Sequence, residues 1–500
     1  MKKNSILSAA LLAFGTLGAQ AGGILTNTNQ NAAFLRNFAQ EGQITLTSLY
    51  ANPAGNAFLS PGWHLSLNSQ TAIQQRNINT TFPLFALNTE TPGQATHEFK
   101  GKALAPVIPS FTLSHNWDRW SLSAHFALVG GGGKCEFDKG LGSFEALYAS
   151  TIAQSLPGTV NAMVQQTVTQ QLMEAGLTQA QAQGIAATGT YNSRMTGYDL
   201  DAYMKGRSYY FGLQLGGAYK IKDNLSAYIG IRGVYATCNY NGYVQDISAN
   251  YAYSYNVPAI PGAFPGAEGQ GTGKADLNDN SLALNCDQTG FGITPIFGLD
   301  WEVSKQWNLA IKYEAPTRMS LKNDSQMNHF AQAQAADPTS PLAQFKDGEK
   351  VREDIPAILA VGAEYRPIET VRLDASVKTY FDKSARKYGS KEEQLDHNTW
   401  DFCFGAEYDC TKLLTVSASW QHTLYGMSDA YMNDLSFNLS SHSLGLGIRL
   451  HPSKYFNVDL GYMHTFYGDR TVKTPTAIGN KVDAYSRKND VVGIGFNLYF

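Results

Sequence analysis

The sequence has little charge and few cysteines, and these shortages exclude several kinds of protein. Asp, Glu, Lys and Arg together make up 16% of the 500 residues, whereas an average domain has about 25%. With a net charge of −3, the chain has no strongly basic surface to neutralise phosphates, so we expect no nucleic-acid partner. Five cysteines are too few for a disulfide-built scaffold or a zinc cluster.

Long apolar runs are also missing, apart from one near the start. Lys2 and Lys3 precede an apolar stretch from Ile6 to Leu17, and Ala19-Gln20-Ala21 follows it. This order is typical of a secretory signal peptide, which we predict over residues 1–21. The stretch is shorter than the roughly 20 residues that span a bilayer, and no later segment has 18 consecutive apolar residues. An inner-membrane helical protein is therefore excluded, and an exported chain must use strands for any membrane role.

Apolar residues alternate with small or polar residues in many segments, which is the period of a β-strand. The clearest apolar rows are Val492, Ile494, Phe496, Leu498 and Phe500; Leu444, Leu446, Ile448 and Leu450; Leu414, Val416, Ala418 and Trp420; and Val371, Leu373, Ala375 and Val377. This alternation predicts strands with one apolar face. It fits a soluble sandwich as well as a membrane barrel.

The lengths of the connections favour the barrel. Short links such as 116–118, 222–224 and 304–306 alternate with long ones such as 134–205, 245–287 and 324–351. Short turns on one rim and long loops on the other are typical of bacterial outer-membrane barrels, whose closed sheet leaves no strand edge in lipid. Because the segments from Gly62 to Phe500 number about fourteen, we predict an all-β transmembrane antiparallel barrel of about 14 strands in the outer membrane.

Aromatic residues near predicted strand ends support this prediction. They are Trp120, Trp301, Trp307, Tyr365 and Trp420. Such residues form the interfacial girdle of a barrel, although packing between two sheets also explains them. The terminal Phe500 resembles the signal by which the barrel-assembly machinery recognises its substrates, so we expect that machinery as a partner and the barrel as a monomer.

Residues 22–60 do not alternate, yet they are too apolar for a free tail. They contain Asn52-Pro53-Ala54 before the first strand. Further along are Ala105-Pro106 with Pro109, Ile355-Pro356, and Tyr462-Met463-His464. In these features, and over essentially the whole mature chain, the sequence resembles the FadL family of outer-membrane transporters for long-chain fatty acids and other hydrophobic compounds.

The resemblance implies an N-terminal plug over residues 22–60, with Asn52, Pro53, Ala54 and Gly55 as plug or ligand-contacting residues. It implies a barrel over residues 61–500 with long extracellular loops, notably 130–205 and 245–287. It also implies a kink in the third strand, predicted over 119–129, that opens the wall sideways. Glycine in a strand marks a bend, so we place the kink at Gly130, Gly131, Gly132 and Gly133, where the start of a flexible loop is the other interpretation.

The expected function is passive uptake of hydrophobic compounds, most of all long-chain fatty acids, captured in a plugged barrel and released sideways into outer-membrane lipid. Candidate binders of a ligand carboxylate are Arg232, Lys312, Lys378 and Arg449. A structural role in pairs with residues such as Glu314 or Asp374 is the alternative. We expect no cofactor and no metal.

Enzyme motifs are weak, and we expect no enzyme. The glycines 269, 271 and 273 before Lys274 do not have P-loop spacing, and Asp276-x-Asn278-x-Asn280 lacks the glycine and the closing Glu of a calcium loop. His125, Ser121 and Ser123 share a predicted lumen-facing row, which leaves an outer-membrane lipid-acting enzyme as an alternative function. An adhesin or structural barrel is the other alternative.

Two smaller features complete the sequence. Val160, Met163, Val164, Val168 and Leu172 recur at helical spacing in the link after the third strand, so we predict a helix there that starts at Pro157-Gly158. Cys238 and Cys286 flank one long loop and could pair if their Cα atoms lie close enough.

Overall fold

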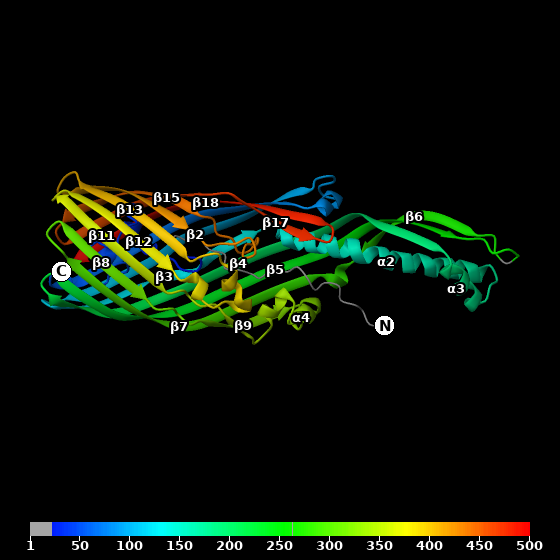
Figure 1. Ribbon diagram of the computed structural model, residues 1–500, viewed down its shortest axis with the longest axis horizontal. Helices are drawn as coiled ribbons and strands as arrows, with labels where there is room; N and C mark the ends of the chain where they lie inside the picture. Colours follow the sequence, from blue (N-terminus) through cyan, green and yellow to red (C-terminus); the bar gives the residue numbers. More distant parts are fainter. Residues whose placement is uncertain (1–22, 263) are drawn as a thin grey trace.

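The structure is a computed structural model that describes residues 23–262 and 264–500, so the predicted signal peptide lies outside the described residues. Its eighteen strands form one antiparallel sheet (Figure 1). The strands are β1 (Gly62–Thr81), β2 (Thr96–Asn116), β3 (Trp120–Phe137), β4 (Thr190–Lys222), β5 (Leu225–Val257), β6 (Ala267–Asp276), β7 (Leu282–Glu302), β8 (Trp307–Glu314), β9 (Ser320–Met327), β10 (Lys350–Arg352), β11 (Ile358–Ile368), β12 (Val371–Tyr380), β13 (Thr399–Asp409), β14 (Leu414–Leu424), β15 (Ser441–Ser453), β16 (Phe456–Tyr467), β17 (Arg470–Thr476) and β18 (Gly479–Tyr499).

Several of these strands are two parts of one barrel strand. β6 and β7 both pair with β5, β9 continues β8 along β7, β10 and β11 pair with β9 and β8, and β16 and β17 both pair with β18. The last strand pairs with the first, from His64 opposite Tyr499 to Thr81 opposite Val482. The sheet is therefore a closed antiparallel barrel of 14 strands, as predicted.

The direction in which the side chains face excludes the soluble sandwich. In β18 the apolar Val492, Ile494 and Phe496 are exposed, whereas Asn489 and Asn497, which flank this row, are buried. The other predicted rows behave alike: Leu444 and Leu446 in β15 and Leu373 and Val377 in β12 face outward. An apolar outer face over a polar interior suits strands surrounded by lipid. Among the described helices, none is both long enough and apolar enough to cross a membrane.

Aromatic residues line the rim that carries the short turns. Trp120, Trp301 and Trp307 are each about half exposed there, at 57%, 47% and 45%. Trp420 instead lies inside β14, half-buried and stacked on Phe404. At the same rim the start of the first barrel strand meets the end of the last one. Trp63 and Phe500 exchange backbone hydrogen bonds there, of 2.7 and 2.9 Å.

Strands β4 and β5 run far beyond the apolar band and, with β6, form an arm along the long axis of the molecule (Figure 1). This corrects the predicted loops 130–205 and 245–287: β3 continues to Phe137, β4 begins at Thr190, β5 continues to Val257 and β7 begins at Leu282. Helices α2 (Gly142–Glu174) and α3 (Gln179–Ala187) cover one side of the arm. The remaining helical segments are α1 (Ala32–Arg36), α4 (His329–Ala335) and the 3-10 turns η1 (Leu46–Ser48), η2 (Gly55–Phe58), η3 (Pro83–Leu87), η4 (Asn278–Asn280), η5 (Pro341–Phe345), η6 (Asp382–Ser384) and η7 (Tyr388–Gln394).

The helix predicted in this region exists, but its start was wrong. Pro157 lies inside α2, which begins fifteen residues earlier at Gly142. Val160, Val164, Val168 and Leu172 are buried on one face of α2, whereas Met163 is 46% exposed. The apolar stripe therefore packs on the arm itself.

Candidate functional site

Residues 23–58, here called the N-terminal segment, are buried along nearly their whole length. Asn31 is the N-cap residue of the segment's helix α1, and its side chain accepts the backbone N–H of Phe34 at 2.9 Å. Phe34, Leu35 and Phe38 pack against Met463 and Val491 of the wall. A Cβ atom added to Gly461 would lie 2.6 Å from the Ala32 carbonyl oxygen, so this close approach requires glycine.

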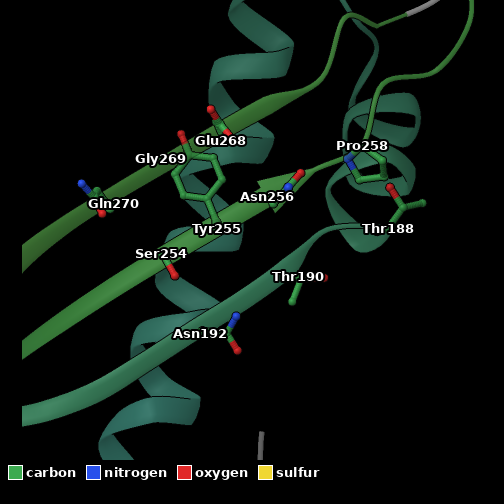
Figure 2. A pocket seen from close by; sticks show the side chains of 10 residues that line it. All are labelled: Thr188, Thr190, Asn192, Ser254, Tyr255, Asn256, Pro258, Glu268, Gly269 and Gln270. Carbon is green, nitrogen blue, oxygen red and sulfur yellow. The ribbon is translucent and has the colours of Figure 1, made fainter.

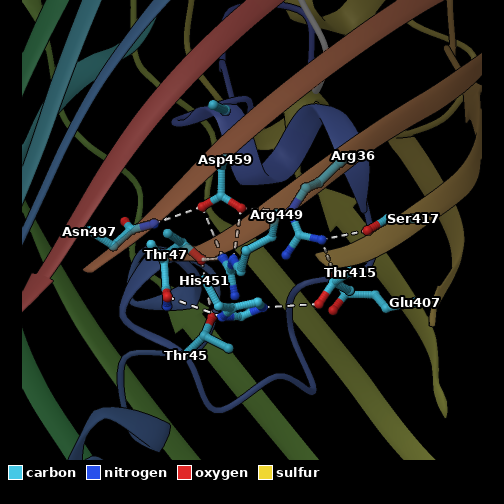
Figure 3. A network of polar contacts seen from close by, with 12 residues as sticks. Arg36, Thr45, Thr47, Glu407, Thr415, Ser417, Arg449, His451, Asp459 and Asn497 are labelled. Carbon is cyan, nitrogen blue, oxygen red and sulfur yellow. Dashed lines mark hydrogen bonds and ion pairs between the residues drawn. The ribbon is translucent and has the colours of Figure 1, made fainter. Parts of the chain in front are cut away.

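A buried ion network holds α1 to the wall (Figure 3). Arg36 donates to Asp459 at 2.8 Å and pairs with Glu407 at 3.0 Å. Arg449 holds the same Asp459 through two hydrogen bonds of 2.8 and 3.0 Å, and it donates to Thr47 of the segment at 3.2 Å. Because breaking a buried pair leaves an uncompensated charge, this network fixes the segment in one position.

The predicted motif anchors the other end of the segment. Its residues Asn52, Pro53, Ala54 and Gly55 are all buried. The Asn52 amide donates to Asp300 on β7, and its side-chain oxygen accepts the Gly55 N–H at 3.1 Å. The Ala54 carbonyl accepts a hydrogen bond from Ser226 of β5 at 2.8 Å. The motif therefore joins the segment to two strands.

The four cations proposed for a ligand carboxylate all face the lumen, and protein carboxylates already engage each of them. Arg232 and Lys312 pair with Glu314 at 2.6 and 2.7 Å, Lys378 pairs with Glu41 at 3.1 Å, and Arg449 pairs with Asp459 at 2.8 Å. Arg232 and Lys312 also lie over the ring of Tyr50, 4.7 and 4.3 Å from its centroid. A ligand carboxylate must compete with these partners, so carboxylate binding by the four cations stays a prediction.

The barrel wall is interrupted between β2 and β3. These strands pair from Asn116 to Phe111 and again at Lys102 and Gly101, but residues 103–110 of β2 have no partner on β3. Pro106 and Pro109 lie in this stretch, and proline has no N–H to donate to a neighbouring strand. The break therefore follows from the sequence of β2 as well as from the glycines of β3.

The four glycines are the irregular part of β3 itself rather than the start of a loop. The register with β4 shifts between Leu128 and Gly130, and again between Gly130 and Gly133. Gly131 has φ +87°, and a Cβ there would lie 2.5 Å from the Ser208 carbonyl oxygen. The N-terminal segment fills the freed positions, because Asn27 N–H donates to Val129 O at 2.9 Å and Gly131 N–H donates to Leu25 O at 3.0 Å.

A cavity of about 260 Å³ lies in the wall at this break. Side chains that face the lumen line one part of it, including Ala72, Met463 and Val491, and outward side chains line the other, including Val107 and Phe211. Asn27 and Asn29 of the N-terminal segment also line it. We call this space the wall cavity.

No pattern in the sequence predicts the inward-folded loop over residues 425–440, which joins β14 to β15. Most of its side chains are buried, among them Tyr431, Leu435 and Phe437. Asp434 accepts the backbone N–H of Ser143 at 2.7 Å and so caps α2, whose own N-cap residue makes no side-chain cap. The loop has no periodic pattern, so only its polar and aromatic mixture could have suggested burial.

Two larger cavities lie apart from the wall cavity. One of about 900 Å³ is on the arm, lined by polar side chains of alternate residues on β4, β5 and β6, such as Asn192, Ser254 and Gln270 (Figure 2). The other, of about 1040 Å³, lies at the rim of short turns, among charged groups such as Arg366, Arg372 and Asp409. Neither borders the wall cavity.

The residues considered for catalysis are not assembled as a hydrolase site. His125 Nδ1 lies 2.9 Å from Thr112 Oγ1, and its ring contacts Tyr50. Ser123 bonds to the Gly216 carbonyl at 3.5 Å, and within the described residues Ser121 makes no side-chain hydrogen bond. Residues 23–262 and 264–500 contain no cluster of three or more potential metal ligands of the His, Cys, Asp or Glu type.

The five cysteines are all free. Cys238 lies opposite Gln288 and Cys286 lies opposite Tyr240, so the two thiols on β5 and β7 are two residues out of register. Cys238 instead contacts the Ser208 hydroxyl at 3.3 Å.

No family model and no curated protein matches the sequence. Solved structures do match the fold. A FadL homologue from Pseudomonas aeruginosa superposes with a TM-score of 0.58 at 15% identity, covering 96% of this chain and 100% of its own. The chain folds as a FadL-type barrel. A deletion mutant of the monoaromatic hydrocarbon channel TodX superposes with a TM-score of 0.50 at 11% identity over 91% of this chain and 94% of its own.

The FadL-type barrel with its exposed apolar band makes this chain a multi-pass outer-membrane protein. Its identity to these structures is too low to carry over a substrate. The solute must be argued from the wall cavity and the N-terminal segment.

Proposed function

We propose that this FadL-type barrel takes up hydrophobic compounds, above all long-chain fatty acids, and releases them sideways into the membrane. The wall cavity is the observation that carries the proposal, because lumen-facing and outward-facing side chains line the same space. An apolar solute gains about 0.8 kcal/mol for each buried CH2, and the bilayer offers the same gain. Sideways transfer is therefore nearly isoenergetic and needs no fuel.

The N-terminal segment serves as the plug in this proposal. This role is supported by its burial, by Asn27 and Asn29 in the lining of the wall cavity, and by its hydrogen bonds to the irregular part of β3 through Leu25 and Asn27. Movement of residues 25–29 away from β3 widens the cavity toward lipid. The ion network around Arg36 and the Asn52 anchor lie further along the segment, so they hold it while its first residues move.

Uptake of a labelled long-chain fatty acid by cells that depend on this protein tests the proposal. We expect replacement of Asn52, Pro53 and Ala54 to reduce uptake several-fold, because loss of a buried hydrogen bond to a carboxylate costs about 1–3 kcal/mol in anchoring the plug. The folded barrel should persist, as shown by its resistance to SDS and its amount in the outer membrane. Unchanged uptake by the folded variant contradicts the role of the motif. Mass spectrometry of lipid extracted from the purified protein identifies the solute.

A further inference from the structure

The arm carries a strand with one open edge. β6 pairs with β5 along all ten of its residues, whereas β7 takes the same side of β5 only from Val244 toward the barrel. Among the described strands, none pairs with the other edge of β6, and none of its ten residues is buried. Helix α2 packs on β4 and β5 instead. Because an edge strand presents unpaired N–H and C=O groups, β6 is a template for a further strand.

Alternate residues of β6 direct their backbone groups toward this open edge. Leu277, which continues the register of β6, donates its N–H to the Ile247 carbonyl at 2.9 Å. In an antiparallel pair, residues that bond to the neighbouring strand alternate with residues that do not. The even-numbered residues from 268 to 276 therefore turn their N–H and C=O groups away from β5. The side chains of these residues are all exposed on one face of the arm.

Tyrosine rings of β5 lie across the other face of β6. The glycines at 269, 271 and 273 are opposite three tyrosines of β5. A Cβ atom added to Gly271 would lie 2.7 Å from the Tyr253 hydroxyl, and one added to Gly269 would lie 2.6 Å from the ring of Tyr255. Only glycine leaves room for these rings. On this face the three glycines therefore place no side chain at the open edge that would obstruct a second strand.

The charges of β6 select one register for a second copy of the same strand. A two-fold axis through Gly271 places Glu268 of each copy opposite Lys274 of the other. Both residues direct their backbone groups to the open edge, so this register also forms the ladder hydrogen bonds. An axis through residue 272 would place Glu268 opposite Asp276, and one through residue 270 would leave Glu268 opposite an uncharged residue. Opposite charges directly across a sheet stabilise it, and like charges destabilise it.

Both charged side chains are available for such a contact. Lys274 lies 3.7 Å from Asp199 with its side chain 62% exposed, and a surface pair of this kind contributes little. Glu268 is exposed, and within residues 23–262 and 264–500 it takes part in no ion pair. The opposite edge of the arm, residues 190–197 of β4, has Arg194 as its single charged residue, so it offers no complementary pair to a second copy.

We propose that two copies of this chain join through β6, paired antiparallel about Gly271, and so connect the outer membranes of two cells. The two-fold axis is perpendicular to β6, and β6 runs along the arm, away from the barrel (Figure 1). The second barrel therefore lies at the opposite end of the joined arms. With the long connections outside the cell, as in other barrels of this kind, the two barrels lie in facing membranes and each stays a monomer in its own. One such contact is weak, but many copies on each cell act together.

Charge reversal in the full-length protein tests this contact. Two batches of cells that produce the protein, labelled in two colours and with lipopolysaccharide that lacks its long polysaccharide chains, are mixed, and clumps of both colours are counted. We expect E268K cells, and likewise K274E cells, to clump at least about tenfold less than wild-type cells, because each variant opposes like charges at both ends of the interface. E268K cells mixed with K274E cells should clump nearly as the wild type does, since positions 268 and 274 again carry opposite charges in both pairs.

R194E is the matched control, because it reverses an exposed charge at the opposite edge of the arm, and it should clump as the wild type does. Clumping of E268K or K274E cells at the wild-type level overturns the contact, and so does a mixture of the two variants that fails to clump. Wild-type cells that do not clump, or that clump equally with cells lacking the protein, also overturn it. The contact goes beyond solute uptake, so fatty-acid uptake, SDS resistance and the amount in the outer membrane should be the same in all these variants.

Discussion

Asp382 holds the start of the N-terminal segment from the rim that carries the long connections. It lies in the turn η6 after β12, is 1% exposed, and accepts backbone hydrogen bonds from Ile24 and Thr399. Burial raises the pKa of this carboxyl from 3.8 to about 6. The charged form is therefore disfavoured in the folded protein, and the carboxylate costs up to about 3 kcal/mol at neutral pH.

Because the pKa of Asp382 is raised in the folded protein, lowering the pH should remove the destabilisation that its charged form causes. The cost is fully present above the folded pKa of about 6 and disappears as the pH falls toward 3.8. We expect Asp382→Asn to stabilise the barrel at about pH 7.5 and the gain to shrink by about half near pH 5. The measurement is the midpoint of thermal unfolding, followed by loss of SDS resistance, for both proteins across this range. Burial lowers the pKa of the Lys391 amino group to about 7, so its effect on stability changes with pH in the direction opposite to that of Asp382. Because Lys391 is present in both proteins, its effect drops out of the difference between them. A gain that does not change with pH contradicts the assignment.

The sequence predicts which residues matter better than it predicts the residues that they contact. The motif at Asn52 was predicted to matter, but its partner Asp300 is 248 residues away and only the barrel register brings them together. Glu314 was named as a possible partner for the lumen cations, and it holds both Arg232 and Lys312. The register also places Arg76 opposite Arg487, a pairing that nothing local in the sequence predicts.

At the scale of elements, the irregular stretch of β3 contains two nearby glycines, Gly131 and Gly133, that differ in the space around them. Gly131 has φ +87° and no room for a Cβ, whereas Gly133 has φ +66° with nothing within 4 Å of a Cβ. We expect Gly131→Ala to shift β3 against β4 and to reduce fatty-acid uptake several-fold. Gly133→Ala is the matched control, because it carries only the strain of a positive φ, about 1–2 kcal/mol, and should leave uptake close to that of the wild type. Equal uptake by both variants contradicts a role for the wall break.

Strands and helices are predictable where the apolar residues follow a regular period, and the predictions fail where that period stops. The strands in the lipid-facing band alternate strictly, and their number and direction came out as predicted. Beyond the band both faces of β4 and β5 are in contact with water or covered by helix, so their alternation fades and the sequence pattern predicts loops there. The start of α2 was misplaced because Pro157 was interpreted as a beginning, whereas the helix continues through it. Loop 425–440 has no period, and its inward fold could not be foreseen.

At the scale of the whole molecule, the closed sheet surrounds an interior in which, among the described residues, the N-terminal segment and the inward-folded loop 425–440 are buried. Charged groups on the wall, such as Lys378, Asp374 and Asp459, are buried because the segment covers them, through Glu41, Asn37 and Arg36 respectively. Without the segment these groups face an empty, polar bore that water can hydrate. The barrel ladder between β18 and β1 does not involve the segment, so the sheet should still close.

Deletion of residues 23–58 should therefore turn the barrel into an aqueous pore. We expect the deleted protein to remain SDS-resistant and to pass ions across a planar bilayer with a conductance at least about tenfold above that of the full chain, because a polar barrel lumen without its filling conducts as porins do. N52A is the matched control: it weakens one anchor but leaves the lumen occupied, so its conductance should stay close to that of the full chain. A folded deletion variant that conducts no better than the intact protein would mean that the inward loops alone seal the bore, and the segment would then lose its role as the plug.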